Sequence, residues 1–80
     1  MYIAVSKVEP LSNYMLHLTF KGGEEKLFDM KPYLEHGIFK GLKDESMFMT
    51  ATIFFDTVGW ANNADIDPET LYEDGKLVGN

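Results

Sequence analysis

The chain has 80 residues, enough for one domain, and its content of 45% apolar and 14% aromatic residues excludes intrinsic disorder. The net charge of −6 comes from 13 carboxylates against seven lysines, so we expect no direct binding to nucleic acid or to anionic membranes. The length predicts a single domain over residues 1–80 with a small core. The chain has no cysteine and so cannot form a disulfide to stabilise that core, which is compatible with a reducing compartment.

The first predicted element is a strand from Tyr2 to Val8, which is rich in β-forming residues and stops at Pro10. Val5 and Val8 break strict alternation, so a bulge fits this strand. The segment has no basic region followed by an apolar run and therefore does not resemble a signal peptide. Nowhere do apolar residues run for the ~18 positions of a membrane-spanning helix. We expect a soluble, cytoplasmic protein.

A β-hairpin is predicted next. The segment Met15 to Phe20 alternates, which places Leu16, Leu18 and Phe20 on one face of a strand. Gly22 and Gly23 can take the positive φ of a tight turn, and the run from Glu25 to Met30 leads back as the second strand.

Two short helices are predicted after this hairpin. Pro32 can open the first, and Gly37 ends it. Asp44 can cap the second, which holds Met47 and Phe48. Between the helices lie three apolar residues spaced for burial: Ile38, Phe39 and Leu42.

The second half begins with a shorter hairpin. Ala51 to Phe55 has β character, and a turn at Asp56 and Thr57 leads into Val58, Gly59 and Trp60. A loop at Asn62 and Asn63 follows.

A last helix is predicted from its capping residues. Asp67 is the N-cap, Pro68 takes the first position, Glu69 suits the helix dipole and Gly75 lies beyond the end. Leu71 and Tyr72 would face inward. The element order predicts an α+β fold: a small antiparallel sheet of two hairpins plus an N-terminal strand, with short helices mainly on one side.

Acidic residues of the late segment have the spacing of some oxygen ligands in a calcium loop. Asn63, Asp65, Asp67 and Asp74 would supply these oxygens. However, the sharp bend of such a loop requires glycine where this chain has Pro68. Helix capping by Asp67 explains the same residues, so no metal site is predicted.

Catalytic motifs are also missing. Histidine is the usual residue for acid-base catalysis near neutral pH, but neither His17 nor His36 lies in a supporting motif, and His17 is on the face opposite the predicted core. The serines lie outside any nucleophile-elbow pattern, and Gly22-Gly23 lacks the lysine and helix start of a phosphate loop. We predict no enzymatic activity, no catalytic residue and no cofactor.

Binding to another protein is the class of function that these exclusions leave. Beyond Lys43, eight acidic residues accompany the single lysine Lys76, a distribution that attracts a basic partner or simply provides solubility. The single tryptophan, Trp60, fits either a core position or an interface hot spot. The candidate interaction residues are Trp60, Asn62, Asn63, Asp65, Asp67 and Tyr72.

The landmarks together resemble a known family. The segments Leu16 to Gly23, Phe28 to Met30, Phe39 to Leu42 and, above all, Trp60 to Tyr72 are similar to the bacterial family catalogued as domain of unknown function 2442. Two positions depart from the family pattern: Ala61 stands where proline is usual, and Asn63 where glycine is usual, although asparagine also tolerates the left-handed conformation.

The resemblance implies a small α+β domain. Some relatives carry an added helix-turn-helix region, which we do not expect in this protein, and others look like one half of two-gene, toxin-antitoxin-like modules. The leading hypothesis is therefore a protein-interaction module, as the acidic antitoxin-like or regulatory member of a two-protein pair. Two alternatives stay open: a small ligand-binding domain or enzyme with a polar site near Trp60, Asn62 and Asp65, and a structural homodimer.

Overall fold

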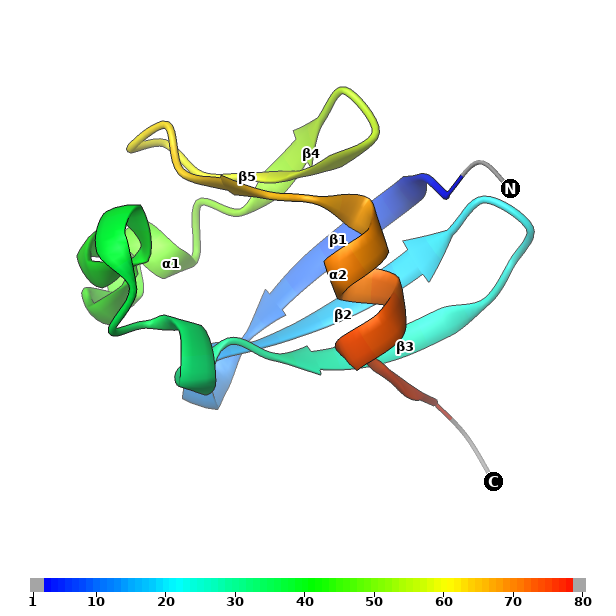
Figure 1. The fold of residues 1–80 in the computed structure, drawn as a ribbon, viewed down its shortest axis with the longest axis horizontal. Helices are drawn as coiled ribbons and strands as arrows, with labels where there is room; N and C mark the ends of the chain where they lie inside the picture. Colours follow the sequence, from blue (N-terminus) through cyan, green and yellow to red (C-terminus); the bar gives the residue numbers. More distant parts are fainter. Residues whose placement is uncertain (1–2, 79–80) are drawn as a thin grey trace.

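Two antiparallel sheets and a set of short helices make up residues 3–78, the part of the chain that the computed structural model describes (Figure 1). The four-stranded sheet has the order β1-β2-β3-β7, and the three-stranded sheet has the order β4-β5-β6. The strands are β1 (Val5–Leu11), β2 (Met15–Phe20), β3 (Glu25–Asp29), β4 (Thr52–Phe54), β5 (Thr57–Gly59), β6 (Asp65–Ile66) and β7 (Lys76–Leu77). The helices are α1 (Glu45–Phe48) and α2 (Pro68–Asp74), with short 3-10 segments at Ser12–Tyr14, Lys31–Tyr33 and Gly37–Lys43.

The hairpin of β2 and β3 confirms its prediction. Leu16, Leu18 and Phe20 are buried on one face of β2. Gly22 and Gly23 have φ of 107° and 96°, a region that only glycine enters without strain. The turn and the alternation thus agree on one register.

Strand β1 differs from its prediction at both ends. Tyr2 lies outside the described residues, but Ile3 and Ala4, which were predicted in the strand, precede it, because β1 begins at Val5. The expected end was wrong, because β1 continues through Pro10 to Leu11. Proline is tolerated there because β1 is an edge strand of its sheet, where a missing amide costs no ladder bond. The expected bulge is confirmed as a register shift between Val5 and Lys7.

The middle of the chain is less regular than expected. The first predicted helix is only the 3-10 segment Lys31–Tyr33, and Gly37 begins the next 3-10 segment instead of ending the first. Leu42 is buried as expected, but Ile38 is 55% exposed, so its predicted burial was wrong. Three residues per turn place Ile38 and Leu42 on different faces, whereas an α-helical spacing would have brought them together. The Asp44 cap of α1 is confirmed by a bond from the Ser46 amide.

The second hairpin, of β4 and β5, is confirmed and belongs to a separate sheet. Its turn is Phe55-Asp56, one residue earlier than predicted. The amide of Val5 donates to the carbonyl oxygen of Asp56 at 2.9 Å, which joins the edge of β1 to this turn.

Helix α2 has the predicted bounds and caps. The Asp67 side chain accepts a bond from the Thr70 amide, Pro68 takes the first turn, and Leu71 is fully buried. The helix lies over the inner face of the four-stranded sheet (Figure 1). Gly75 follows it with an ordinary φ of −74°.

One hydrophobic core joins both sheets and the helices, which confirms the α+β class. The largest fully buried side chains come from β1, β2, β3, β5, α1, α2 and the connections between them: Phe28, Phe48, Leu16, Leu18, Met30, Leu42, Leu71, Val5 and Val58. Within the described residues, no helix has the length and apolar character needed to cross a bilayer.

Candidate functional site

A pocket of about 300 Å³ lies on the three-stranded sheet. Three of the predicted interaction residues, Trp60, Asn63 and Asp65, line it. The other lining residues come from β4, β5 and the loop before β6: Thr52, Phe54, Gly59 and Ala64.

Trp60 belongs to both the core and the pocket wall. Its side chain is only 5% exposed, and its indole nitrogen donates to the Phe48 carbonyl at 3.0 Å. The ring packs against Phe39 edge-on and against Phe48 at a tilt. Because both its apolar body and its polar nitrogen are satisfied inside the protein, Trp60 gives the pocket a fixed wall.

The loop between β5 and β6 is closed by its own hydrogen bonds. The Trp60 amide donates to the Ala64 carbonyl at 2.9 Å, and the Asn63 amide donates to the Trp60 carbonyl at 3.0 Å. Asn62 turns its side-chain oxygen to the Ala64 amide at 3.1 Å, so its amide group serves the loop and does not line the pocket. Asn63 has a φ of 71°. The loop therefore presents Asp65 at the pocket rim.

Asp67 serves the start of α2 and does not line the pocket. The Thr70 hydroxyl donates to its carboxylate at 2.7 Å, and this bond lowers the pKa of Asp67. Asp67 is thus a cap, as the sequence predicts.

Tyr72 points toward the four-stranded sheet instead. Its hydroxyl donates to Glu24 at 2.9 Å, which raises the pKa of Tyr72. The ammonium group of the buried Lys26 lies 3.7 Å from the centre of the Tyr72 ring and donates to the Tyr72 carbonyl. Tyr72 therefore docks α2 and is separated from the pocket residues.

Two aromatic residues that were not among the predicted interaction residues lie at the pocket: Phe54 lines it, and Phe55 is the next residue in the chain. Phe54 is 53% exposed and Phe55 is 85% exposed. Their rings pack edge-on with centroids 4.8 Å apart. The sequence offered one sign of this exposed pair, since two phenylalanines directly precede Asp56. The predicted turn was one residue too late, so Phe55 was assigned to the strand and not to the turn.

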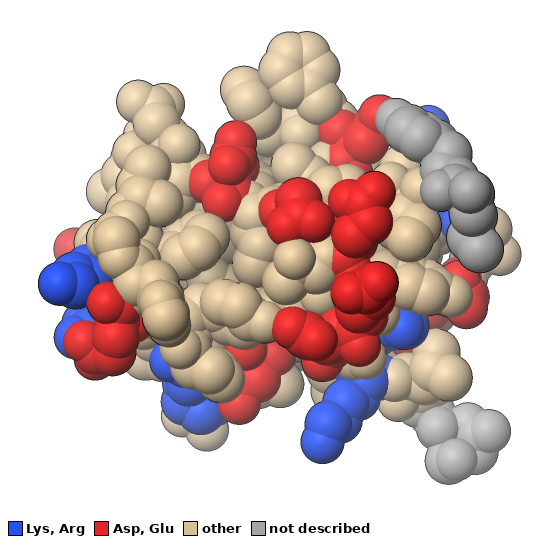
Figure 2. All heavy atoms as spheres, viewed as in Figure 1, with Lys and Arg blue, Asp and Glu red and all other residues tan. Residues whose placement is uncertain are grey.

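The carboxylates of the late segment gather on one surface, which we call the acidic face. Figure 2 shows acidic side chains over α2 and the chain leading into it. None of the ion pairs among the described residues involves a member of this face. We define its members as the exposed carboxylates of β6, α2 and the residue that joins them: Asp65, Asp67, Glu69, Glu73 and Asp74.

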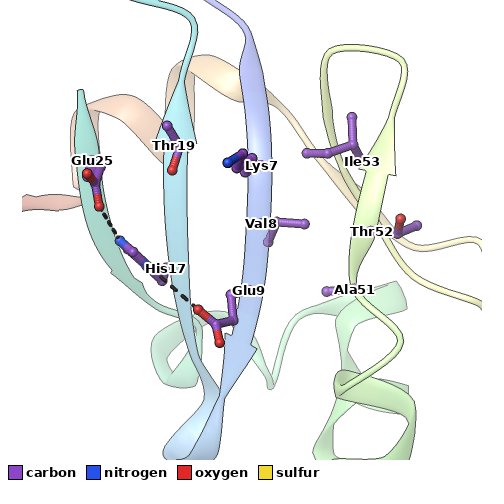
Figure 3. A pocket seen from close by; sticks show the side chains of 9 residues that line it. All are labelled: Lys7, Val8, Glu9, His17, Thr19, Glu25, Ala51, Thr52 and Ile53. Carbon is purple, nitrogen blue, oxygen red and sulfur yellow. Dashed lines mark hydrogen bonds and ion pairs between the residues drawn. The ribbon is translucent and has the colours of Figure 1, made fainter. Parts of the chain in front are cut away.

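A second hollow, of about 600 Å³, lies where β4 meets the outer face of the four-stranded sheet. Figure 3 shows His17 between two carboxylates there. Its Nε2 lies 2.8 Å from Glu25 and its Nδ1 lies 3.7 Å from Glu9. The sequence placed His17 on this face, but the strand pairing that brings the two carboxylates to it could not be read from the sequence.

Metal ligation finds no support in the geometry. Across residues 3–78, no three His, Asp or Glu side chains are grouped so that they could hold an ion. Asp67 is engaged in capping.

Comparison with family models gives a match over residues 5–76, to the family described as Protein of unknown function (DUF2442). The chain belongs to this family. Comparison with curated proteins and with solved structures gives no significant match.

The DUF2442 match covers β1 to β6 and α2, and so includes the pocket and the acidic face. Asn63 was expected to keep the left-handed backbone conformation, and its positive φ confirms this. Asparagine occupies this region more readily than most residues, which explains how the loop keeps its shape without glycine.

Proposed function

We propose that this DUF2442 chain is a cytoplasmic protein-interaction module, the acidic antitoxin-like or regulatory member of a two-protein pair. The acidic face carries the proposal. Its carboxylates are exposed and lack lysine partners among the described residues, so their field extends into solvent. The partner that fits this surface is a basic protein.

Electrostatics favour recognition over stability as the use of this face. Unpaired like charges on one surface repel one another and lower the stability of the folded chain. The same charges increase the rate of encounter with a basic surface by about 10-fold to 1,000-fold at low ionic strength. A basic partner would also neutralise the repulsion.

The test is co-purification. The untagged chain is expressed together with the tagged protein encoded by the adjacent gene, and the complex is isolated at low salt. We expect co-elution, and an affinity that falls about tenfold or more when Glu69→Gln and Glu73→Gln are combined, because these exposed charges steer the encounter.

Glu9→Gln on the outer face of the four-stranded sheet is the matched control, since it removes a charge outside the acidic face. Its affinity should stay close to that of the wild type. Isolation of the chain without the neighbouring protein under all salt conditions would count against the proposal.

A small ligand is the second candidate, because the pocket beside Trp60 is about 300 Å³, at the lower end of the ~300–1,000 Å³ typical of ligand sites. Such a ligand would raise the melting temperature of the wild type and not of Asp65→Ala. A metabolite screen without any such shift would remove this candidate.

A further inference from the structure

The hairpin tip and the neighbouring pocket form a single surface with a projecting part and a recessed part. We propose that this surface is the anchor site for the basic partner: an apolar side chain flanked by lysine or arginine enters the pocket, and Phe54 and Phe55 cover it. This inference rests on the proposed function, and it assigns the apolar contact that contributes most to the affinity of the complex.

Exposure is the first argument. Phe55 is the most exposed of the large hydrophobic residues described, at 85%, and Phe54 beside it is 53% exposed. Exposed aromatic residues next to a pocket are typical of interface hot spots, because they bury a large area at low entropic cost. Moving both rings from water into an interface would release free energy in proportion to the apolar area buried.

Backbone conformation is the second argument. Phe55 has a φ of 57°, in the left-handed region that bulky residues rarely enter. Two-residue hairpin turns normally place glycine, asparagine or aspartate at such a position. Phenylalanine at this position of the tip therefore costs about 1–3 kcal/mol of local backbone strain. The fold itself does not require a phenylalanine there.

The pocket offers a preformed apolar recess. One wall is the Trp60 ring, held by the bond to the Phe48 carbonyl. Space beside it is left by Gly59, which has no side chain, and by Ala64, which has only a methyl group. Since these groups are fixed by the core, an incoming side chain meets a surface that needs little reorganisation.

Charge selects the occupant. Asp56 follows Phe55 in the turn, Asp65 lines the pocket, and the acidic face continues from there along α2. A second copy of the chain would bring its own carboxylates against these, which disfavours self-docking. A segment with lysine or arginine around one apolar residue pairs with both features.

The experiment uses two synthetic probes on the full chain, acetyl-Lys-Lys-Leu-Lys-Lys-amide and the same peptide with alanine in place of leucine. Trp60 is the only tryptophan and lines the pocket, so its fluorescence reports occupancy. At low ionic strength we expect the leucine peptide to bind about tenfold more tightly, as burial of the larger side chain predicts.

Variants separate the anchor from the charge. Phe54→Ser and Phe55→Ser should each remove most of the preference for leucine, and they should weaken the complex with the neighbouring protein. Ile38→Ser is the control, because Ile38 is about as exposed as Phe54, at 55% against 53%, but does not line the pocket. It should leave binding unchanged.

Three outcomes would overturn the inference. Equal affinity for both peptides, with a loss caused only by Glu69→Gln and Glu73→Gln, would remove the anchor and leave the proposed function standing. Loss of a homodimer in Phe55→Ser, seen by light scattering, would make a second copy the occupant. Absence of binding by both peptides and by the neighbouring protein would remove the proposed function as well.

Discussion

At the scale of single residues, Phe55 combines an unfavourable backbone conformation with a side chain that the fold barely uses. Phe55→Gly should raise the free energy of unfolding by up to about 1 kcal/mol, because glycine adopts positive φ without strain. The shift of the urea midpoint measures this gain.

Phe54→Gly is the control for this substitution. Phe54 lies in β4, where the backbone is extended and glycine relieves no strain. Glycine there only increases the conformational entropy of the unfolded chain, so the free energy of unfolding of Phe54→Gly should fall. If both variants lost stability equally, the conformation of Phe55 would not be the source of the effect.

Asp67 illustrates a polar residue whose role could be predicted from the sequence. Asp67→Ala should lower the free energy of unfolding by about 1 kcal/mol at neutral pH, the usual value of an N-cap. Asp65→Ala, which removes an exposed carboxylate without capping bonds, should change it much less.

The Asp67 effect should also depend on pH. The bond from the Thr70 hydroxyl holds the pKa of Asp67 below its ordinary value of 3.8 in the folded chain. Its stabilisation is therefore complete above that value and is lost as pH falls through the lower pKa of the folded state. Urea titrations between neutral pH and pH 2 should show wild type and Asp67→Ala converging only at the acidic end. A constant difference would contradict this cause.

At the scale of elements, predictions succeeded where local chemistry acts alone. Alternation and two glycines define the β2-β3 hairpin, and capping residues define α2. The 3-10 segments were missed because their residues also suit an α-helix, and only packing decides between them. Strands β6 and β7 have two residues each and exist only through their partners, so no local pattern marks them.

The end of α2 shows how close packing can require glycine without an unusual φ. A Cβ at Gly75 would lie 2.7 Å from the Leu71 carbonyl oxygen and 3.2 Å from the Cβ of Lys26. Gly75→Ala should therefore lower the free energy of unfolding by about 1–3 kcal/mol, as overpacking does.

Thermal unfolding of Gly75→Ala checks this expectation, with Lys76→Ala as the control at the exposed neighbouring position. An unchanged melting temperature in Gly75→Ala would mean that α2 can move away from β3 without loss. The buried contact between Lys26 and Tyr72 argues against such freedom.

At the scale of the whole molecule, the sequence predicted the α+β class and the surplus of late carboxylates but not their arrangement. Trp60, Asn63 and Asp65 meet at one pocket because a loop joins β5 to β6, whereas Tyr72 turns to the other sheet because α2 crosses it. The three pocket residues are near neighbours in the sequence, whereas the contacts that take Tyr72 away from them join distant segments and leave no trace in a single sequence.

The unpaired acidic face should make stability depend on salt. Added salt shortens the Debye length, the distance over which charges act on one another, to about 10 Å at 0.1 M. The repulsion among these carboxylates therefore falls as salt is added. We expect the melting temperature to rise between 0.01 and about 0.2 M sodium chloride. Glu73→Lys should raise it already at low salt and flatten the dependence. A wild type insensitive to salt would show that the charges do not repel one another appreciably.

The hydrogen bond from the Val5 amide to the Asp56 carbonyl ties the hairpin tip to the first strand. Any molecule that clamps Phe54 and Phe55 would also hold this carbonyl in place. The amide proton of Val5 would then exchange with deuterium more slowly, although Val5 itself is buried away from the docking surface. Exchange at one backbone amide thus reports whether the tip is engaged, without a fluorescent probe on either protein.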